Sequence, residues 1–309
     1  MLSRRIIRVK VMQTLFTWQT TPELTKSEIL SFYDDSIDAA YELLGYHLYL
    51  LTKVAEHSVQ DSERRKGKLL PSAFDKGFTD KLYNNSVIQS LVRDKELKEQ
   101  WENDKVAEKV PDDFTKKLYK TYSLSDTYTD YVNAESSLEG DREIILSLFK
   151  DLIKQEYFND TIEDYYYNWL DDESIIVGTI KKIIKQLPET GLNDKYGPTK
   201  ETIVDFGRNL LEYIVDHNTG LEDMIEPLIE NWDMDRVARI DMIFIKMSVA
   251  EMIIFPTIPT KVSINEYIDL TKLYSTEKSK EFVNGILDKC LQTLSGEKKI
   301  VKSGRGLIE

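Results

Sequence analysis

The stretch from Val262 to Leu294 most constrains the fold, because its apolar residues recur at the spacing of two consecutive α-helices. Ser263 and Glu266 have the spacing of a capping box, in which two side chains satisfy backbone N–H groups at a helix start. One face of the first helix would carry Ile264, Tyr267, Ile268 and Thr271. The apolar face of the second helix would carry Phe282, Val283, Ile286, Leu287, Cys290, Leu291 and Leu294. The pattern predicts two helices that bury these faces in a common core.

The rest of the 309-residue chain is also predicted to be helical. Glycine and proline, which interrupt helices, occur only 13 and 8 times, so the composition favours an all-α fold over a turn-rich β fold. The polar segment 62–68 and the segment 191–200, which contains Gly, Asn, Asp and Pro, should lie between helices. Helices are expected at residues 3–19, 27–59, 86–101, 111–120, 141–157, 160–170, 173–186, 200–217, 221–231, 235–254, 262–273 and 277–294.

Four segments are predicted along the chain. Residues 1–24 hold an arginine-rich arm and the first helix, and residues 25–197 form a long, acidic helical region. Residues 198–296 form a regular helical core, and residues 297–309 form a charged tail that we expect to be flexible. Between residues 126 and 173 acids far outnumber bases, which indicates a solvated surface or, alternatively, a binding face for a basic protein.

The overall charge and the single cysteine limit the classes of function. A net charge of −13 argues against nucleic-acid binding by the whole surface, although a local basic site is still possible. Cys290 is the only cysteine and cannot form an internal disulfide, which fits a reducing cytoplasm. There is no run of about 18 apolar residues, so no membrane span is expected. The first ten residues have some features of a transit peptide, but this bias ends by Glu23.

A local basic site is predicted at the N-terminus. On a helical wheel Arg4, Arg5 and Arg8 lie within about 100° of one another, and the first 22 residues contain no acid to neutralise them. Guanidinium groups suit phosphate oxygens, so such a cluster can hold a nucleic-acid backbone. An ordinary basic helix start is the alternative. Cations at a helix N-terminus oppose the helix dipole, which favours a functional reason, and we expect all three side chains to be exposed.

Several segments together resemble the NusB family of bacterial transcription antitermination factors. The resemblance rests on INEYIDLTK and EFVNGILDK in the C-terminal helices, on RRIIRVKVMQTLFTWQ at residues 4–19, on FGRNLLEYI and WDMDRVARIDMIFIKMSVAEMI between residues 206 and 253, and on Pro259. This chain departs from the family pattern at Ile6 and Lys10, and at Lys246, where arginine is common. It also carries a long insertion between the two blocks.

The resemblance implies a fold and a function. The fold is all-α, with two small helical bundles packed across each other and an additional helical insertion. The function is that of an RNA-binding factor that acts with NusE, a ribosomal protein, on boxA-type single-stranded RNA in ribosomal transcripts. The factor meets the RNA polymerase elongation complex only indirectly. The acid excess of the insertion should keep it away from RNA, because like charge repels phosphate.

The resemblance also implies RNA contacts by Arg4, Arg5, Arg8, Gln13, Lys278, Phe282 and Asn284. An exposed ring at Phe282 could stack on an unpaired base, but its apolar spacing favours core packing. Asn284 could contact a base edge or simply bond the neighbouring backbone, and Lys278 could be an ordinary solvated lysine.

No catalytic, metal or cofactor signature accompanies this pattern. His47, His57 and His217 are widely separated and have no companion cysteine, and there is no phosphate-binding glycine loop. Two alternatives stay open. The same helical fold occurs as the RNA-targeting part of ribosomal RNA cytosine methyltransferases, whose catalytic cysteine usually follows proline, whereas Cys290 follows Lys289. The second alternative is a helical protein-binding scaffold that has lost RNA binding.

Overall fold

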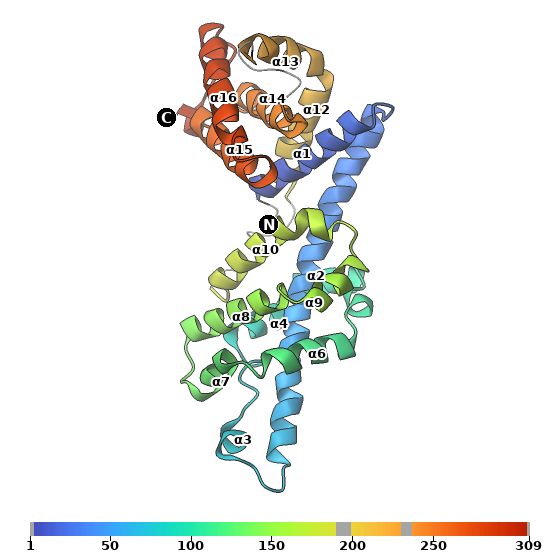
Figure 1. The fold of residues 1–309 in the computed structure, drawn as a ribbon, viewed down its shortest axis with the longest axis vertical. Coiled ribbons are helices and arrows are strands. Elements are labelled where there is room, and N and C mark those ends of the chain that lie inside the picture. Colours follow the sequence, from blue (N-terminus) through green and yellow to red (C-terminus); the bar gives the residue numbers. More distant parts are fainter. Residues whose placement is uncertain (1–2, 190–198, 230–236, 308–309) are drawn as a thin grey trace. The chain divides into compact units, whose positions relative to one another are not determined.

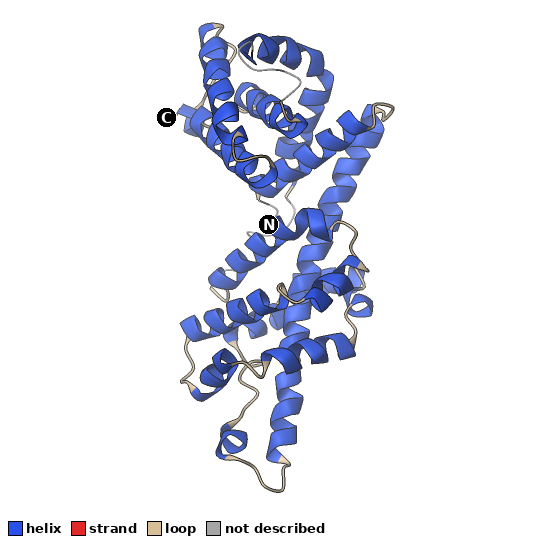
Figure 2. Cartoon of the chain, viewed as in Figure 1, coloured by secondary structure: helices blue, strands red, loops and turns tan. Residues whose placement is uncertain are grey.

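The computed structural model describes residues 3–189, 199–229 and 237–307. These residues form helices joined by short loops, with no β-strand among them (Figure 2), which confirms the all-α prediction. The chain forms two compact units. Unit 1 contains Asp38–Gly197, and unit 2 contains Leu2–Ile37 and Pro198–Glu309.

Unit 2 holds the N-terminal helix and the C-terminal third of the chain (Figure 1). Its elements are α1 (Arg4–Thr20), the π-helix η2 (Glu201–Arg208), α12 (Asn209–Asp216), α13 (Asn218–Ile225), the 3-10 helix η3 (Glu226–Ile229), α14 (Arg239–Ile254), α15 (Thr260–Tyr274), α16 (Ser279–Gly296) and the 3-10 helix η5 (Gly304–Leu307). The long helix α2 (Lys26–Lys66) contributes residues 26–37 to this unit and residues 38–66 to unit 1.

Helix α14 lies at the centre of unit 2. It is apolar on every side, as expected of a helix that other helices surround. Helices α1, α12, α13, α15 and α16 all contact it (Figure 1). Its fully buried apolar side chains are Ile243, Phe244, Ile245, Met247, Val249, Ala250 and Met252. Charged residues on this helix therefore enter an apolar environment and need partners there.

Unit 1 is a separate helical assembly with its own core. Beyond α2 it contains α3 (Ala73–Gly77), α4 (Ser86–Arg93), α5 (Lys95–Asn103), the 3-10 helix η1 (Val106–Lys109), α6 (Asp112–Tyr122), α7 (Asp126–Asn133), α8 (Leu138–Leu152), α9 (Glu156–Glu163) and α10 (Trp169–Gln186). Helix α8 contacts α4, α6, α7 and α10. Its core includes Leu91, Trp101, Leu118, Phe149 and Trp169, which are buried, whereas Leu146 is half-buried.

Some predicted boundaries are wrong for identifiable reasons. Helix α2 continues through most of the predicted polar break, because Arg64 and Arg65 pair with Asp61 one turn earlier. The predicted helix 86–101 is two helices, since Asp94 ends α4 and caps α5 by accepting a hydrogen bond from the Leu97 N–H. The predicted loop 191–200 and the helix start at 235–236 fall largely outside the described residues.

The C-terminal tail has defined contacts over residues 302–306. Lys302 Nζ donates to the backbone oxygens of Met252 and Phe255 at 2.9 and 3.0 Å. The Ser303 N–H donates to the Pro256 oxygen, and Gly306 is buried against the same loop. A side chain could not replace the Gly306 hydrogen, because its Cβ would lie 1.9 Å from that Pro256 oxygen. The predicted flexible tail is therefore held against the end of α14 over these residues.

Candidate nucleic-acid interface

The N-terminal arginines of α1 occupy different environments, which corrects the expectation that all three are exposed. Arg8 is 3% exposed, and Lys10, two residues further along α1, is 2% exposed. The side chains of Arg4 and Arg5 remain 40% and 37% exposed. The reason is the packing of α1 against α14, which turns the Arg8 position inward together with Ile7 and Val11. Only the first two arginines can meet a ligand from solvent.

Arg8 forms a buried ion pair with Glu251 of α14. Its Nε and Nη2 donate to the two carboxylate oxygens at 2.8 and 2.7 Å, and Glu251 is 0% exposed. The same carboxylate accepts hydrogen bonds from the hydroxyls of Ser263 and Tyr267, each at 2.8 Å. Every oxygen of the buried acid is thus satisfied, as a buried charge requires. The arrangement joins α1, α14 and α15.

This network changes the interpretation of Ser263. The sequence predicts a capping box at Ser263 and Glu266, but α15 begins three residues earlier, at Thr260, after Pro259. Ser263 is fully buried and donates to Glu251, while Glu266 lies 3.4 Å from Arg8. Both residues serve the buried arginine instead of the helix start.

The network also perturbs the ionisation of its members. Burial alone would lower the pKa of Arg8, but the hydrogen bonds and negative charge of Glu251 outweigh it and raise the pKa. Burial, followed by the charge of Glu251, raises the pKa of Tyr267 well above its ordinary value. Both side chains therefore keep their protons at neutral pH.

Arg4 and Arg5 are held loosely on the surface. Arg4 Nη2 lies 3.1 Å from Glu201, and its guanidinium stands 5.4 Å from the centre of the Phe206 ring. Arg5 Nη1 is 3.9 Å from both Glu266 and Asp269 of α15. Exposed pairs of this length contribute little stability, so phosphate oxygens could replace these carboxylates as partners.

A surface groove runs between α15 and α16 and includes one predicted residue, Asn284. The groove has a volume of about 600 Å³. The Asn284 side chain is half-buried and donates to Asp288 at 3.3 Å. Its lining residues are Asn265, Ile268, Asp269, Lys272, Lys280, Glu281 and Asn284. The two lysines, Asn265 and the half-buried Asn284 give this groove both cations and amide groups.

Asp269 connects the groove to the arm. The hydrogen bond from Lys272 lowers the pKa of Asp269, and the charges of Lys272, Arg5 and Lys280 add to the shift. Three cations from α1, α15 and α16 therefore lie close enough to act on one carboxylate. Arg5 lies 3.9 Å from Asp269 in the groove, and we call the whole region the arm–groove surface (Arg4, Arg5, Asn265, Lys272, Lys280 and Asn284).

Of the other predicted contacts, one is buried, one is half-buried and one is exposed. Phe282 is 6% exposed and packs in the core, so its ring cannot stack on a base without movement of α16. Its place beside Val283 on the apolar stripe explains this burial. Gln13 is half-buried two turns along α1 and already has a partner. Lys278 is exposed at the position before α16.

Sequence reasoning missed Lys272, Lys280 and the whole Glu251 network. A signal for the network was present, because Glu251 is a lone acid within the apolar run SVAEMII and needs a buried cation. The two lysines gave no such signal, since solvated lysines are common on helices. Their role depends on the packing of α15 against α16, which one helical wheel does not reveal.

The structure also bears on catalytic readings. Cys290 is fully buried, and burial raises the pKa of its thiol to about 12, so it stays protonated and unreactive. Among residues 3–189, 199–229 and 237–307, no three His, Cys, Asp or Glu side chains are arranged to hold a metal ion. Nor is any helix in these ranges long and apolar enough to span a membrane.

Fold and site together define a class: an all-α helical-bundle protein whose candidate site is a charged surface beside a groove. The family model named NusB family matches residues 160–292. This range, which is less than half of the chain, is similar to the NusB family. The matched range includes α10, which lies in unit 1.

Three curated relatives are each called "Transcription antitermination protein NusB". The protein of Chloroherpeton thalassium is 37% identical over 34% of this chain and 50% of its own length. That of Salinibacter ruber is 36% identical over 34% of this chain and 65% of its own. That of Listeria welshimeri is 37% identical over 27% of this chain and 65% of its own length. The chain thus spans half to about two thirds of these relatives. No solved structure matches it.

Proposed function

We propose that this chain is an RNA-binding transcription antitermination factor. It would bind boxA-type single-stranded RNA together with NusE, and act on the RNA polymerase elongation complex through that pair. The match of residues 160–292 to the NusB family model, and the similarity to curated NusB proteins, support the general role. The arm–groove surface is the observation that carries the proposal, because it places exposed cations beside a groove with amide groups.

The physical basis is backbone binding by a few cations. Arg4, Arg5, Lys272 and Lys280 can neutralise phosphates, while Asn265 and Asn284 can bond base edges. Four cations among several carboxylates form a weak site, so the RNA affinity of the chain alone should be low. We therefore expect NusE to increase the affinity by supplying further contacts to the same RNA.

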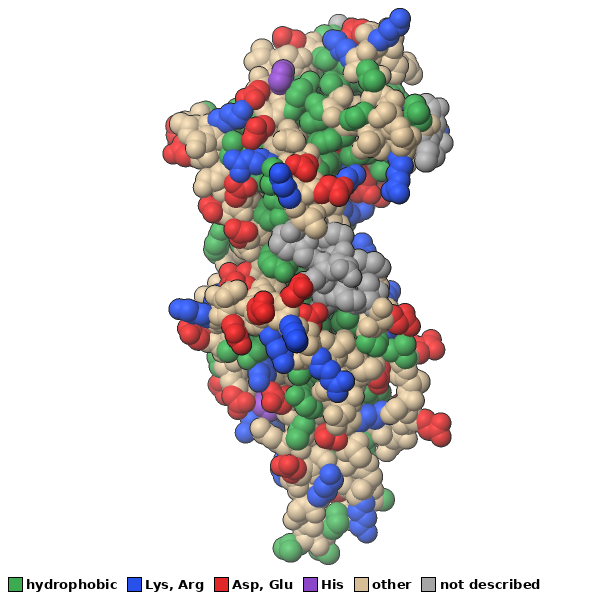
Figure 3. Space-filling model, turned by 180° about the vertical axis from the view of Figure 1, so that it is seen from behind, with side chains coloured by type: hydrophobic (Ala, Val, Ile, Leu, Met, Phe, Trp, Pro, Cys, Tyr) green, Lys and Arg blue, Asp and Glu red, His purple; other side chains and the backbone are tan. Residues whose placement is uncertain are grey.

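Acid and base distribution in unit 1 supports an RNA path on unit 2. On the visible face in Figure 3, acidic and basic side chains of unit 1 are interspersed, with no extended positive area. A long polyanion needs a continuous positive track, which such a surface does not offer. This face of unit 1 therefore offers no second track for RNA, and the contacts that we propose are those of the arm–groove surface.

A titration of labelled boxA-like RNA with the full chain tests the proposal, with and without NusE, at several salt concentrations. For single strands each phosphate contact contributes about 0.7 to the log–log salt slope. Replacing Arg4 and Arg5 together by Ala should reduce the slope by about 1.4. Asn284→Ala should weaken binding without a change of slope, because an amide releases no counterion.

Lys26→Ala is the matched control. Lys26 is a surface cation paired with Asp216 at 2.7 Å, and it lies past the C-terminal end of α1, away from Arg4 and Arg5. Its loss should change neither the affinity nor the slope. The proposal is wrong if wild-type chain and NusE together show no salt-dependent binding, or if the Arg4/Arg5 variant binds like the control.

A further inference from the structure

A cavity of about 320 Å³ opens in unit 1 on residues that the proposed function does not use. Its walls come from two facing helices. Helix α2 supplies His57, Gln60, Asp61 and Arg64, and α6 supplies Lys116, Tyr119 and Lys120. This volume is near the lower end of the range of small-molecule sites, about 300–1,000 Å³.

Three cations gather around this cavity. Lys116 and Lys120 are one turn apart on α6, so both side chains project from the same face. Both are exposed, and neither has an ion-pair partner in the described part of the chain. Arg64 enters from α2, and its side chain is 73% exposed. Like charges at this spacing repel each other, which is unfavourable unless an anion joins them.

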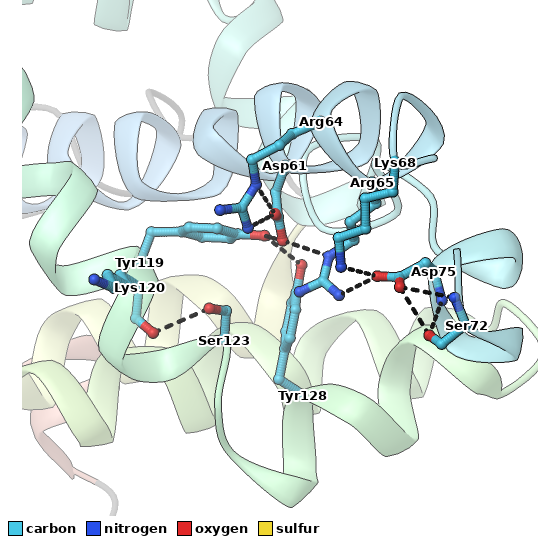
Figure 4. Close-up of polar contacts among 10 residues, drawn as sticks. All are labelled: Asp61, Arg64, Arg65, Lys68, Ser72, Asp75, Tyr119, Lys120, Ser123 and Tyr128. Atoms are coloured by element: carbon cyan, nitrogen blue, oxygen red, sulfur yellow. Dashed lines mark hydrogen bonds and ion pairs between the residues drawn. The ribbon is translucent and has the colours of Figure 1, made fainter. Parts of the chain in front are cut away.

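The one acid that lines the cavity is already saturated. Asp61 accepts hydrogen bonds from Arg64 at 2.5 Å, from Arg65 at 2.9 Å and from the Tyr119 hydroxyl at 3.2 Å (Figure 4). Burial opposes ionisation of Asp61, but the hydrogen bonds from Arg65 and Arg64 lower its pKa. Asp61 pairs with Arg64 and with Arg65, which also pairs with Asp75 at 3.0 Å, so Asp61 has no further capacity to neutralise the two lysines.

The helix dipole explains only one of the three cations around the cavity. Lys120 lies in the last turn of α6, where a cation is favoured by the helix dipole. The dipole does not account for Lys116, one turn earlier, or for Arg64 on the facing helix. Lys117, between them in sequence, shows the ordinary alternative. It stands over the Tyr157 ring, with Nζ 3.3 Å from the ring centre.

Neighbouring acids limit the size of the anion. A second cavity, which shares His57 and Gln60 with the first, contains Glu56 and Asp112. Glu56 pairs with Lys53 at 2.7 Å, while the Asp112 side chain is 81% exposed and lies 3.8 Å from His57. A strand of nucleic acid would meet these carboxylates, whereas a compact anion between the lysines and Arg64 would not.

We propose that the cavity between α2 and α6 binds a small phosphorylated molecule. The phosphate lies between Lys116, Lys120 and Arg64, and the organic part lies along Tyr119. The phosphate relieves the repulsion among the three cations, and it can accept several charge-assisted hydrogen bonds from them. Unit 1 then has a ligand of its own, in addition to the RNA proposed for unit 2.

The test is isothermal titration calorimetry of the full chain with inorganic phosphate, adenosine 5′-monophosphate and adenosine, in chloride buffer at low ionic strength. Adenosine 5′-monophosphate should bind saturably and more tightly than inorganic phosphate, and adenosine should not bind. Added NaCl should weaken binding by screening the site. The double variant Lys116→Ala/Lys120→Ala should reduce the affinity by at least about tenfold, since two charged hydrogen-bond donors are lost.

Lys117→Ala is the control, because it removes the same charge from the same helix outside the cavity. It should change the affinity by less than about twofold, the effect expected of one screened surface charge. Circular dichroism should show unchanged helix content in both variants, because all three lysines are exposed. RNA binding by the double variant should be unchanged, so this proposal can fail without the RNA proposal failing.

Three results would overturn the assignment. The first is no saturable binding of either phosphate probe up to about 10 mM, which is too weak for a built site. The second is equal binding of adenosine and its monophosphate. The third is an equal loss of affinity in the double variant and in Lys117→Ala.

Discussion

Arg8 carries its charge into the interior of unit 2, where desolvation is costly and Glu251 is the main compensation. The sequence shows three similar arginines at the start of a helix. The structure assigns two of them to the surface and one to the core. The contact with RNA that we propose for Arg4 and Arg5 is therefore separate from the support that Arg8 gives to the fold.

Glu251→Gln should strongly destabilise unit 2. The amide cannot balance the Arg8 charge, and removal of one partner of a buried pair costs about 3–5 kcal/mol. The opening free energy of α14 amides, measured by hydrogen exchange and mass spectrometry, should fall by this amount. Arg5→Ala, which breaks only an exposed pair, should cost about 0–1 kcal/mol. Similar losses in both variants would show that the buried Arg8–Glu251 pair contributes no more stability than an exposed pair.

A second residue-scale prediction concerns His47 in unit 1. The ring is fully buried among Phe149, Phe158 and Trp169, and its Nδ1 bonds the Leu43 oxygen at 2.8 Å. Burial lowers the pKa of His47 to about 4 from an ordinary value of 6.5. The unfolded state therefore binds more protons between these values, and stability falls as pH decreases through this window.

The expected loss is about 3 kcal/mol by pH 4, at 1.36 kcal/mol per pKa unit. Urea unfolding at pH 7.5, 5.5 and 4.5, followed by tryptophan fluorescence, measures it. His47→Leu should lose less stability over this range than the wild type, whatever its stability at pH 7.5. Parallel pH curves for the two proteins would show that His47 is not the titrating group.

The spacing of apolar residues predicted which of them are buried, but it did not predict which polar residues are buried. Phe282 lies on a clear stripe, and its burial follows from helical period. Arg8 and Ser263 look like surface residues in their own segments. Both become internal by bonding Glu251 of another helix, which is 243 residues from Arg8 and 12 residues from Ser263. The groove lysines could not be selected either, because their site exists only once α15 and α16 pack together.

At the scale of elements, most predicted helices exist, and the errors concern their ends. Asp94 splits one predicted helix by capping, and ion pairs to Asp61 extend α2. The π-helix η2 was not predicted, since a helical wheel does not distinguish π from α geometry. It forms where α1 and Tyr33 approach closely, and the Tyr33 hydroxyl donates to the Ile203 oxygen at 2.9 Å.

Gly207→Ala tests this close packing. A Cβ at Gly207 would lie 2.1 Å from the Tyr33 oxygen and 2.3 Å from Ile7 Cγ2, so one of these groups must move. Overpacking of this kind costs about 1–3 kcal/mol. Hydrogen exchange of α1 amides should show the loss.

Gly285→Ala provides the matched comparison for Gly207→Ala. Gly285 lies within α16 and has no neighbour within 4 Å of the added Cβ. Alanine there should be neutral or stabilise by about 0.5–1 kcal/mol, because glycine is a poor helix former. A neutral Gly207→Ala would mean that Tyr33 can move without breaking its bond to η2.

For the whole molecule, sequence reasoning separated the terminal blocks from a long middle region, but it could not place the division inside α2. Residues 26–37 of that helix belong to unit 2 and later residues to unit 1, although the helix is continuous. The spacing of apolar residues predicts a helix, but it does not show in which of the two units each turn of that helix is packed.

Replacement of residues 38–197 by a Gly/Ser linker should leave RNA binding intact. The arm–groove surface lies wholly in the remaining residues, so affinity for boxA-like RNA with NusE should stay within about twofold, well below one tenfold step of 1.4 kcal/mol. Far-ultraviolet circular dichroism should first show that the shortened chain is helical. A folded chain that still binds NusE but not RNA would place part of the RNA site in unit 1.

Because Arg8 is buried, its side-chain Nε–H can serve as a nuclear magnetic resonance reporter. Guanidinium Nε–H protons of surface arginines exchange rapidly with water, which usually broadens their nuclear magnetic resonance signals at neutral pH. The Arg8 Nε–H is bonded to Glu251 at 2.8 Å and shielded from solvent, so its exchange requires an opening of the surrounding helices. One resolved ¹⁵Nε signal in this chain would thus report the joining of α1 to α14 and α15, and its loss would mark their separation before the helices themselves melt.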